Sequence, residues 1–134
     1  MHYLLDTSVL SELTKPRPNQ ETLQAFTNHF DDVRLASVCF HELLYGVARL
    51  PEGKRKETIR NAVNALMVSI PVLPYGDAAA VWHARERARL EKAGVTPSFA
   101  DGQIAATAAV NGCRLITANV KDFRRFDLSV ERWD

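Results

Sequence analysis

Long apolar runs and cysteine are both scarce in this sequence. No apolar run approaches the roughly 18 residues that a bilayer-spanning helix needs, and the 134 residues include two cysteines. Cys39 and Cys113 lie far apart without the paired spacing of a zinc site, so we expect two free, buried thiols. The N-terminal residues lack the basic stretch, apolar segment and small-residue cleavage site of a signal peptide. These absences exclude membrane-spanning and disulfide-rich classes and predict a cytoplasmic protein.

An excess of charge of one sign is also missing. Lys and Arg number 17 against 16 Asp and Glu, which gives a net charge of +1. A molecule with so little net charge holds a nucleic acid only through a local basic patch or through metal ions. Two basic clusters fit solvated helix faces, namely KRK at 54–56 and RERAR at 85–89.

What the sequence does contain is a regular alternation of short apolar runs and helical stretches. This alternation predicts a parallel sheet with helices on both faces. A hydrophobic content of 46% and a charged content of 25% are typical of a globular domain. We therefore expect an α/β fold, a three-layer α/β/α sandwich with a central parallel sheet, formed by residues 1–134 as a single domain. The predicted strands are 2–5, 33–36, 70–73, 114–117 and a weaker one at 128–132, and the predicted helices are 7–14, 19–30, 37–50, 53–68, 77–93 and 98–111.

Acidic and amide side chains follow the predicted strands. Asp6 ends the first strand, and Glu42 lies in the second turn of the helix after the second strand. Asn119 comes shortly after the fourth strand, and Asp122 one turn later. These positions share one edge of the sheet, where open α/β sheets bind their ligands. Asp101 opens a helix that follows another helix, so its placement depends on tertiary packing.

Each of these acids also has a simple structural interpretation. Asp6 is placed to cap the helix that begins at Thr7, while Glu42 and Asp122 fit solvent-facing positions. Ser98 and Asp101, in "SFAD", match the capping-box pattern. A structural role explains any one of these acids by itself. The presence of several acids at one edge of the sheet is harder to explain by separate structural roles.

The energetics of gathered carboxylates favour a cation. Two carboxylates about 4 Å apart repel by ~1 kcal/mol in water and ~4 kcal/mol at an effective dielectric constant of 20. Oxygen ligands without His or Cys favour Mg²⁺ or Mn²⁺ over zinc. Such an ion suits phosphoryl chemistry, because it activates a water for in-line attack and stabilises charge on the phosphate. The sequence leaves open whether one or two ions bind.

Three segments resemble the motifs of PIN-domain ribonucleases, the VapC-type toxins of toxin–antitoxin pairs. They are "LLDTSVLSEL" at 4–13, "HELLYGVARLPEGKRK" at 41–56 and "FADGQIAATAAVNGCRLITANVKDF" at 99–123. The likeness runs through nearly the whole chain, and "PEGKRK" with the helix at 77–93 is similar to the FitB-like, plasmid-stability branch. The resemblance implies a PIN-like α/β/α sandwich.

The resemblance also implies roles for individual residues. Asp6, Glu42 and Asp101 match the family's catalytic, metal-binding acidic triad. Asn119 and Asp122 match its more variable metal-binding positions, and the amide of Asn119 has one charge fewer than an aspartate there. The residues that resemble the hydroxyls orienting the acids are Ser8 and Thr117.

The function implied is that of an Mg²⁺-dependent endoribonuclease, with Mn²⁺ as a substitute, acting as a toxin on an RNA substrate. The implied partners are a second copy of the chain and a small DNA-binding antitoxin, within a higher-order complex that reaches operator DNA only through the antitoxin. An arginine or lysine of the antitoxin tail would inhibit the enzyme by replacing the charge of the metal. The sequence does not identify the RNA-contacting residues and nominates only Lys121, Arg124 and Arg125.

Three alternatives stay open at this stage. A haloacid-dehalogenase-like phosphatase would need a second Asp at the position of Ser8. A response-regulator receiver domain would need an acceptor Asp near residues 50–57, which read LPEGKRKE. A metal-free PIN scaffold would have lost the acids. Histidine-based nuclease chemistry is disfavoured, because His41 and Glu42 point about 100° apart on a helix.

Overall fold

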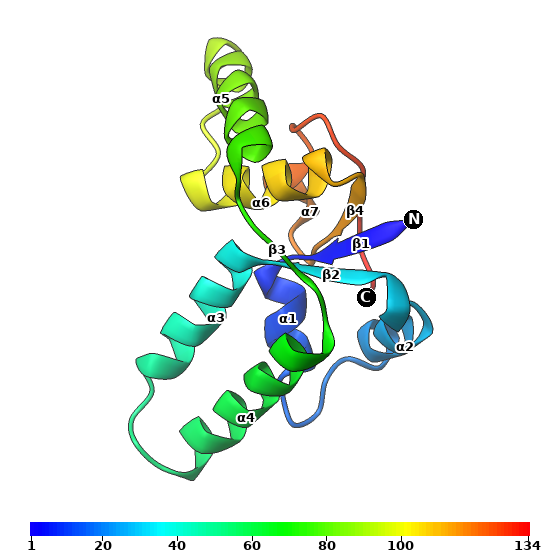
Figure 1. Ribbon diagram of the computed structural model, residues 1–134, viewed down its shortest axis with the longest axis vertical. Coiled ribbons are helices and arrows are strands. Elements are labelled where there is room, and N and C mark those ends of the chain that lie inside the picture. The colour runs from blue at the N-terminus through cyan, green and yellow to red at the C-terminus, as the bar shows by residue number, and fades with distance from the viewer.

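The central element of the molecule is a five-stranded sheet (Figure 1). The computed structural model describes residues 1–134. The strand order is β3-β2-β1-β4-β5 and every neighbouring pair is parallel, which confirms the predicted parallel α/β sheet. The strands are β1 (His2–Leu5), β2 (Val33–Ala36), β3 (Val72–Leu73), β4 (Cys113–Ile116) and β5 (Val130–Glu131).

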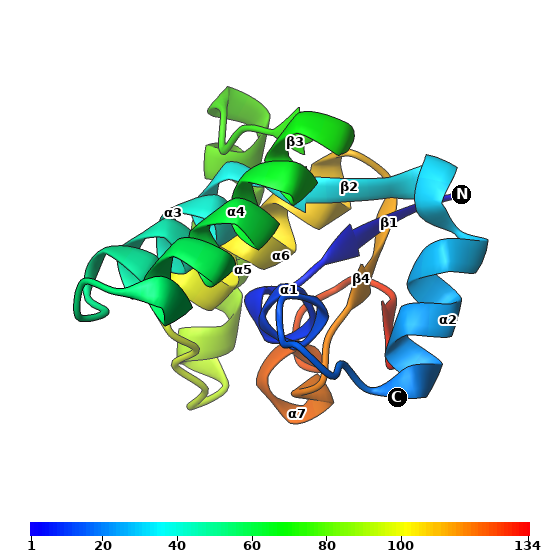
Figure 2. The same ribbon diagram turned by 90° about the horizontal axis from the view of Figure 1, so that it is seen from below.

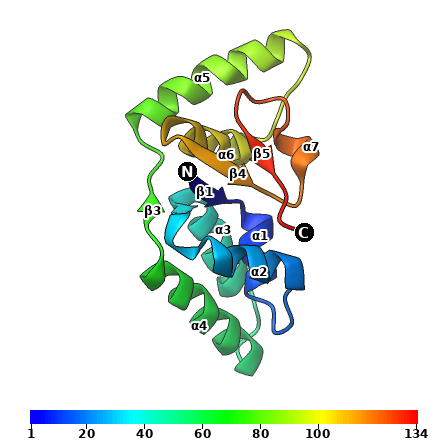
Figure 3. The same cartoon turned by 90° about the vertical axis from the view of Figure 1, so that its right-hand side faces the viewer.

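Helices cover the two faces of this sheet. Figures 1 and 3 show α5 and α6 on one side, with α1, α2, α3 and α4 on the other, so the predicted three-layer sandwich is confirmed. No helix is both long enough and apolar enough to cross a membrane. The helices are α1 (Thr7–Leu13), α2 (Gln20–Asn28), α3 (Ser37–Ala48), α4 (Lys54–Ser69), α5 (Asp77–Lys92), α6 (Phe99–Val110) and α7 (Val120–Phe123), with a 3₁₀ turn, η1, at Phe30–Asp32.

The apolar strands form the core because both faces of a parallel sheet are covered. Leu4, Leu35 and Leu115 are fully buried in the three central strands. The buried alanines of α6, Ala105 and Ala108, let this helix pack closely on the sheet. One cluster of 23 buried apolar residues joins both helical layers.

Two features differ from the sequence prediction. The predicted strand at 70–73 is reduced to two residues, because the Ile70 N–H bonds to the Leu66 carbonyl and so completes α4, and Pro71 has no N–H to donate. The short helix α7 was not predicted, since four residues are too few to show a helical periodicity.

The register of the sheet determines which side chains meet at its carboxyl edge. Leu5 of β1 pairs with Ile116 of β4, so the next residues, Asp6 and Thr117, leave the sheet side by side. Helices α1 and α3 begin directly after β1 and β2, and Figure 2 shows both helices continuing from these strand ends. The fold therefore gathers the ends of β1, β2 and β4 in one place.

Candidate functional site

Asp6 is the most buried of the five residues predicted to bind metal, with 5% of its surface exposed. Its Oδ2 atom accepts hydrogen bonds of 2.8 Å from the hydroxyls of both Ser8 and Thr117. Asp6 occupies the N-cap position of α1 but makes no side-chain cap bond, so the interpretation of Asp6 as a simple helix cap is wrong. Because both donors bind Oδ2, Oδ1 remains free to accept another partner.

The two hydroxyls that hold Asp6 are themselves held in place. Ser8 Oγ accepts a 3.1 Å bond from the Ala118 N–H, and Thr117 Oγ1 accepts a 3.0 Å bond from the Asn119 N–H. The network joins the start of α1 to the segment after β4, which fixes the orientation of the Asp6 carboxylate.

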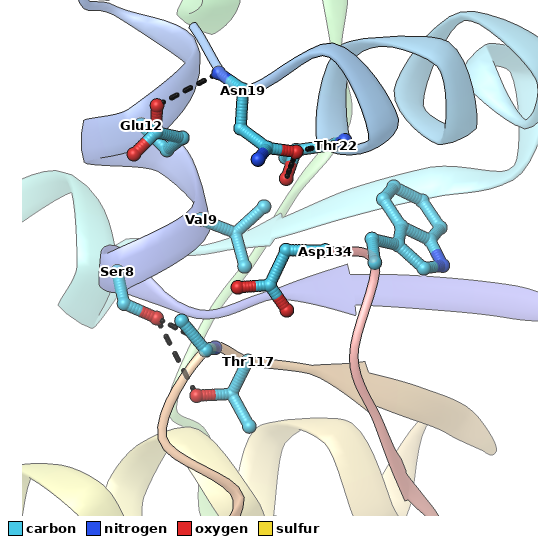
Figure 4. Close-up of a pocket in the computed structure, with 9 residues that line it drawn as sticks. Ser8, Val9, Glu12, Asn19, Thr22, Thr117 and Asp134 are labelled. Carbon is cyan, nitrogen blue, oxygen red and sulfur yellow. Dashed lines mark hydrogen bonds between the residues drawn. The ribbon is translucent and has the colours of Figure 1, made fainter.

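A small cavity of about 100 Å³ borders this network on the side of α1 and α2 (Figure 4). Figure 4 shows Ser8 and Thr117 on one side of it and Glu12, Asn19 and Thr22 on the other. None of the five acids and amides predicted to bind metal lines this cavity. The cavity therefore borders the two hydroxyls that hold Asp6, and Asp6 itself does not line it.

Glu42 lies on the half-buried face of α3 and is held by a hydroxyl that the sequence analysis did not single out. The Thr7 hydroxyl donates a 2.7 Å hydrogen bond to Oε1 of Glu42. Thr7 and Ser8 are the first two residues of α1. Thr7 therefore holds Glu42 and Ser8 holds Asp6 from adjacent positions of one helix. The sequence feature that could have identified Thr7 as a site residue is its hydroxyl, which directly follows the Asp at the end of a strand.

Asp101 lies in the first turn of α6. The Ser98 hydroxyl accepts a 3.1 Å bond from the Asp101 N–H, which confirms the predicted cap of this helix. Burial raises the pKa of the Asp101 carboxyl, and repulsion from Asp6, Asp122 and Glu42 raises it further, against an opposing hydrogen bond from Ser98. The charges of these three carboxylates therefore act on Asp101 in addition to the larger effect of burial.

The last two predicted positions lie at the exposed border of this region. Asn119 precedes α7, and its carbonyl accepts a 3.0 Å bond from the Asp122 N–H. Both side chains are exposed to solvent. They lie at the start of α7, whereas Asp6 precedes α1, and Glu42 and Asp101 lie on α3 and α6.

The donor set suits a hard divalent cation with an incomplete shell of protein ligands. No group of three or more His, Cys, Asp or Glu is already arranged to hold a metal ion. Mg²⁺ does not require such a cage, because it usually keeps several waters and binds one or two carboxylates together with substrate phosphate. The free Oδ1 of Asp6 is an available oxygen ligand. The repulsion between Asp101 and the other carboxylates favours a bound positive charge.

A buried thiol lies beneath the acids. Burial, together with the charges of Asp6 and Glu42, raises the pKa of Cys39 to about 12 against an opposing hydrogen bond with Thr7. The thiol is therefore neutral at physiological pH and is no nucleophile. Cys39 and Cys113 are both free and buried, which confirms the expectation for the two cysteines.

Comparison with known families identifies this arrangement. Residues 3–128 match the PIN domain. The chain belongs to the PIN-domain family. This confirms the resemblance seen in the sequence, and it makes the phosphatase and receiver-domain alternatives wrong.

Individual relatives of this PIN domain cover almost its whole length. Toxin FitB of Neisseria gonorrhoeae is 30% identical over 131 residues, which cover 95% of this chain and 94% of FitB. VapC ribonuclease Y4jK of Sinorhizobium fredii has the same 30% identity over 131 residues, with the same coverage of 95% and 94%. The solved structure of FitAB bound to an IR36 DNA fragment contains a chain that matches with a TM-score of 0.90 at 29% identity, covering 98% of this chain and 96% of that one.

Proposed function

We propose that this PIN domain is a Mg²⁺-dependent endoribonuclease that acts as the toxin of a toxin–antitoxin pair. The observation that carries the proposal is the Asp6 carboxylate, oriented by two hydroxyls on one oxygen and free on the other. The repulsion that Asp6, Asp122 and Glu42 exert on Asp101 adds a need for a cation. The names of the relatives, a toxin and a VapC ribonuclease, support RNA as the substrate.

In this proposal Asp6, Glu42 and Asp101 hold Mg²⁺, or Mn²⁺ in its place, and are the catalytic residues. Asn119 and Asp122 complete the ligand set, directly or through water. When bound, the ion supplies activation of a water and stabilisation of negative charge on the RNA phosphate.

The remaining residues of the site act by positioning. Ser8 and Thr117 hold the Asp6 carboxylate so that Oδ1 points away from the hydroxyl donors. Thr7 does the same for Glu42 through a single bond to Oε1. Such supporting hydrogen bonds orient ligands and tune their basicity, so their loss weakens both binding and activity.

The proposed partners follow from the relatives. FitAB, the structural neighbour, is an assembly bound to DNA, which supports a cognate DNA-binding antitoxin that inhibits this chain and carries it to operator DNA. We also propose that residues 1–134 act as one domain, that the chain forms a homodimer within a higher-order complex, and that it acts on RNA in the cytoplasm.

Cleavage of RNA by the purified protein tests the proposal. Single-stranded RNA should be cut internally with Mg²⁺ or Mn²⁺, remain intact in EDTA, and remain intact with Asp6→Asn at unchanged circular dichroism. Wild-type protein that cuts no RNA in either metal, or Asp6→Asn that cuts at the wild-type rate, would overturn it. A wild-type protein that binds no Mn²⁺ and cuts no RNA would favour the metal-free scaffold.

A further inference from the structure

Residues 129–134 run along one edge of the sheet and then cross to helix α2 (Figures 2 and 3). We call these residues the strap. They include β5, an edge strand of two residues whose neighbour in the sheet is β4. Two backbone hydrogen bonds tie the strap to β4 and the residue after it. The Leu115 N–H donates to the Ser129 carbonyl at 2.9 Å, and the Thr117 N–H donates to the Glu131 carbonyl at 3.0 Å. So short a pairing leaves the strap dependent on its side-chain contacts.

Trp133 is the main anchor of the strap. Its side chain is buried, with 8% exposed. Its ring centroid lies 5.5 Å from that of Tyr3 on β1 and 5.5 Å from that of His29, which follows α2, and it stacks on the His29 ring at an interplanar angle of 22°. The 2.9 Å ion pair between Arg114 and Glu131 contributes less, because these side chains are 39% and 38% exposed. Burial of the indole therefore holds the strap in place.

The strap in turn holds the residues that orient Asp6. Thr117 donates its N–H to the Glu131 carbonyl and its hydroxyl to Oδ2 of Asp6. The second donor to that oxygen, Ser8, accepts a bond from the N–H of Ala118. Both hydroxyls on Asp6 therefore depend on the backbone of two neighbouring residues beside the strap. Hydrogen bonds weaken steeply when their geometry is lost, so a shift of this backbone would loosen the Asp6 carboxylate.

The strap also closes the small cavity behind these hydroxyls. Trp133 and Asp134 line the cavity of about 100 Å³ together with Ser8 and Thr117. Figure 4 shows the Asp134 side chain facing this cavity. Displacement of the strap would open the cavity to solvent, where water competes with Asp6 for the two hydroxyls.

We propose that Trp133 is a positioning residue of the metal site. It anchors the strap, the strap fixes Thr117, and the hydroxyls of Thr117 and Ser8 fix Asp6. This role rests on the proposed function, because Asp6 is a ligand of the proposed cation. Coupling between two sites is reciprocal, so a strap that raises the affinity for the cation must itself become more firmly held when the cation binds. A tryptophan that only fills the core would show no such response.

Tryptophan fluorescence tests this reciprocity with the strap intact. The chain contains two tryptophans, Trp82 and Trp133, so Trp82→Phe leaves Trp133 as the only one. Acrylamide quenching of Trp133 should fall when MgCl₂ is added, and it should not change when Asp6→Asn is present as well. Trp133→Phe is the matched reporter, because its remaining tryptophan, Trp82, lies on α5 away from the strap. Unchanged quenching of Trp133 in a protein that binds Mg²⁺, or an equal response of both tryptophans, would overturn the proposal.

Cation affinity tests the same coupling from the other side. Trp133→Ala should weaken Mn²⁺ binding, measured by isothermal titration calorimetry, by at least about 5-fold, the lower end of typical couplings between sites. Trp133→Phe keeps an aromatic anchor and should restore most of the affinity. Trp82 is a half-buried tryptophan packed against the same core, so Trp82→Ala should lower the Tm and leave Mn²⁺ affinity unchanged. Wild-type Mn²⁺ affinity in Trp133→Ala would overturn the proposal.

Amide hydrogen exchange in EDTA tests the contact between strap and site without any ion. Trp133→Ala should speed exchange of the Leu115 and Thr117 N–H groups, which donate to the strap. Exchange of the Asp6 N–H should change less, because it donates to the Ile116 carbonyl at 2.8 Å inside the sheet. Equal acceleration of all three would mean that the loss of Trp133 only destabilises the whole fold, which would overturn the proposal. Where Trp133→Ala does not fold, the fluorescence of the intact strap decides.

The outcomes also separate the role of Trp133 from the proposed function. If wild type cleaves RNA with Mg²⁺ and Trp133→Ala binds Mn²⁺ like wild type, the ribonuclease stands and the role of Trp133 is overturned. If Mn²⁺ affinity depends on Trp133 but wild type cuts no RNA, the role of Trp133 stands and the ribonuclease is overturned. A wild-type protein that binds neither Mg²⁺ nor Mn²⁺ overturns both.

Discussion

Thr117 and Asp6 lie 111 positions apart in the chain, and the Thr117 hydroxyl donates a 2.8 Å hydrogen bond to Oδ2 of Asp6 in the interior. The same hydroxyl accepts from the Asn119 N–H at 3.0 Å. It therefore links a proposed metal ligand after β1 to a proposed ligand after β4. The pairing of β1 with β4 brings these residues together, so the register of the sheet and the geometry of the site depend on each other.

Thr117→Val tests this link, because valine keeps the shape of threonine and removes the hydroxyl. The variant leaves Asp6 with one donor and the Asn119 N–H without its partner, so the free energy of unfolding should fall by about 1–3 kcal/mol. RNA cleavage should fall by about 10- to 100-fold, as for other supporting hydrogen bonds of metal sites. Urea denaturation and initial cleavage rates measure the two effects. Thr117→Ser keeps the hydroxyl and should retain most of the activity; equal losses in both variants would show that the hydroxyl is irrelevant.

Asp101→Asn should stabilise the metal-free protein while abolishing cleavage. Burial and the neighbouring carboxylates raise the pKa of Asp101, so the folded state holds this proton more tightly than the unfolded state. The free energy of unfolding therefore falls as pH rises from the ordinary aspartate value of about 3.9 to the raised value, and it stays lower above that value. Asparagine has no such charge, so its Tm in EDTA at about pH 7.5 should exceed that of wild type by a few degrees.

The pH dependence provides the control for this prediction. At about pH 3, below the ordinary aspartate pKa, Asp101 is protonated in both folded and unfolded states and the Tm difference should vanish. Calorimetry at both pH values measures it. A Tm of Asp101→Asn equal to or below wild type at neutral pH would mean that Asp101 is not held under electrostatic strain.

Gly102 and His83 should be strongly coupled. A Cβ atom at position 102 would collide with the His83 imidazole, which is buried at 3% exposure and bonds through Nδ1 to the Tyr75 hydroxyl at 2.9 Å. Gly102→Ala should therefore destabilise the wild type by about 1–3 kcal/mol. In a His83→Ala background the space is free, and the same change should stabilise by up to about 1 kcal/mol, since alanine is the better helix former. Urea denaturation of the four proteins measures this; the same effect in both backgrounds would show that the contact is unimportant.

Much of the fold was predictable because its signals are local. The strands at 2–5 and 33–36 are short, mostly apolar runs and form with these bounds as β1 and β2. Ser98 has the pattern of a helix cap and makes the cap bond. The weak strand at 128–132 forms as the two-residue β5.

The rest depends on tertiary contacts that no local pattern contains. Asp101 belongs to a helix that follows another helix, and only the packing of α6 near α3 and β2 brings it toward Asp6 and Glu42. The bond from Thr7 to Glu42 joins α1 to α3 across 35 positions, and the position of Thr7 next to Asp6 does not reveal which acid it will meet.

Divalent ions should stabilise the folded protein by mass action. A ligand that binds only the folded state at about 100 times its Kd adds about 2.7 kcal/mol to the free energy of unfolding. Mg²⁺ at millimolar concentration should therefore raise the Tm of wild type, and EDTA should reverse the rise. Asp6→Asn should show no rise under the same conditions, whereas a rise of equal size in Asp6→Asn would place the stabilising ion elsewhere.

The central claim, that distant acids converge to bind a catalytic cation, is tested most directly by crystals of the protein grown with MnCl₂. An anomalous difference map recorded near the manganese absorption edge locates the ion independently of any activity. We predict a peak within coordination distance of Asp6 Oδ1 and the carboxylate of Asp101, with Glu42 bound directly or through water. A map with no peak at these carboxylates in millimolar Mn²⁺, in crystals whose acids are free of lattice contacts, would contradict the account.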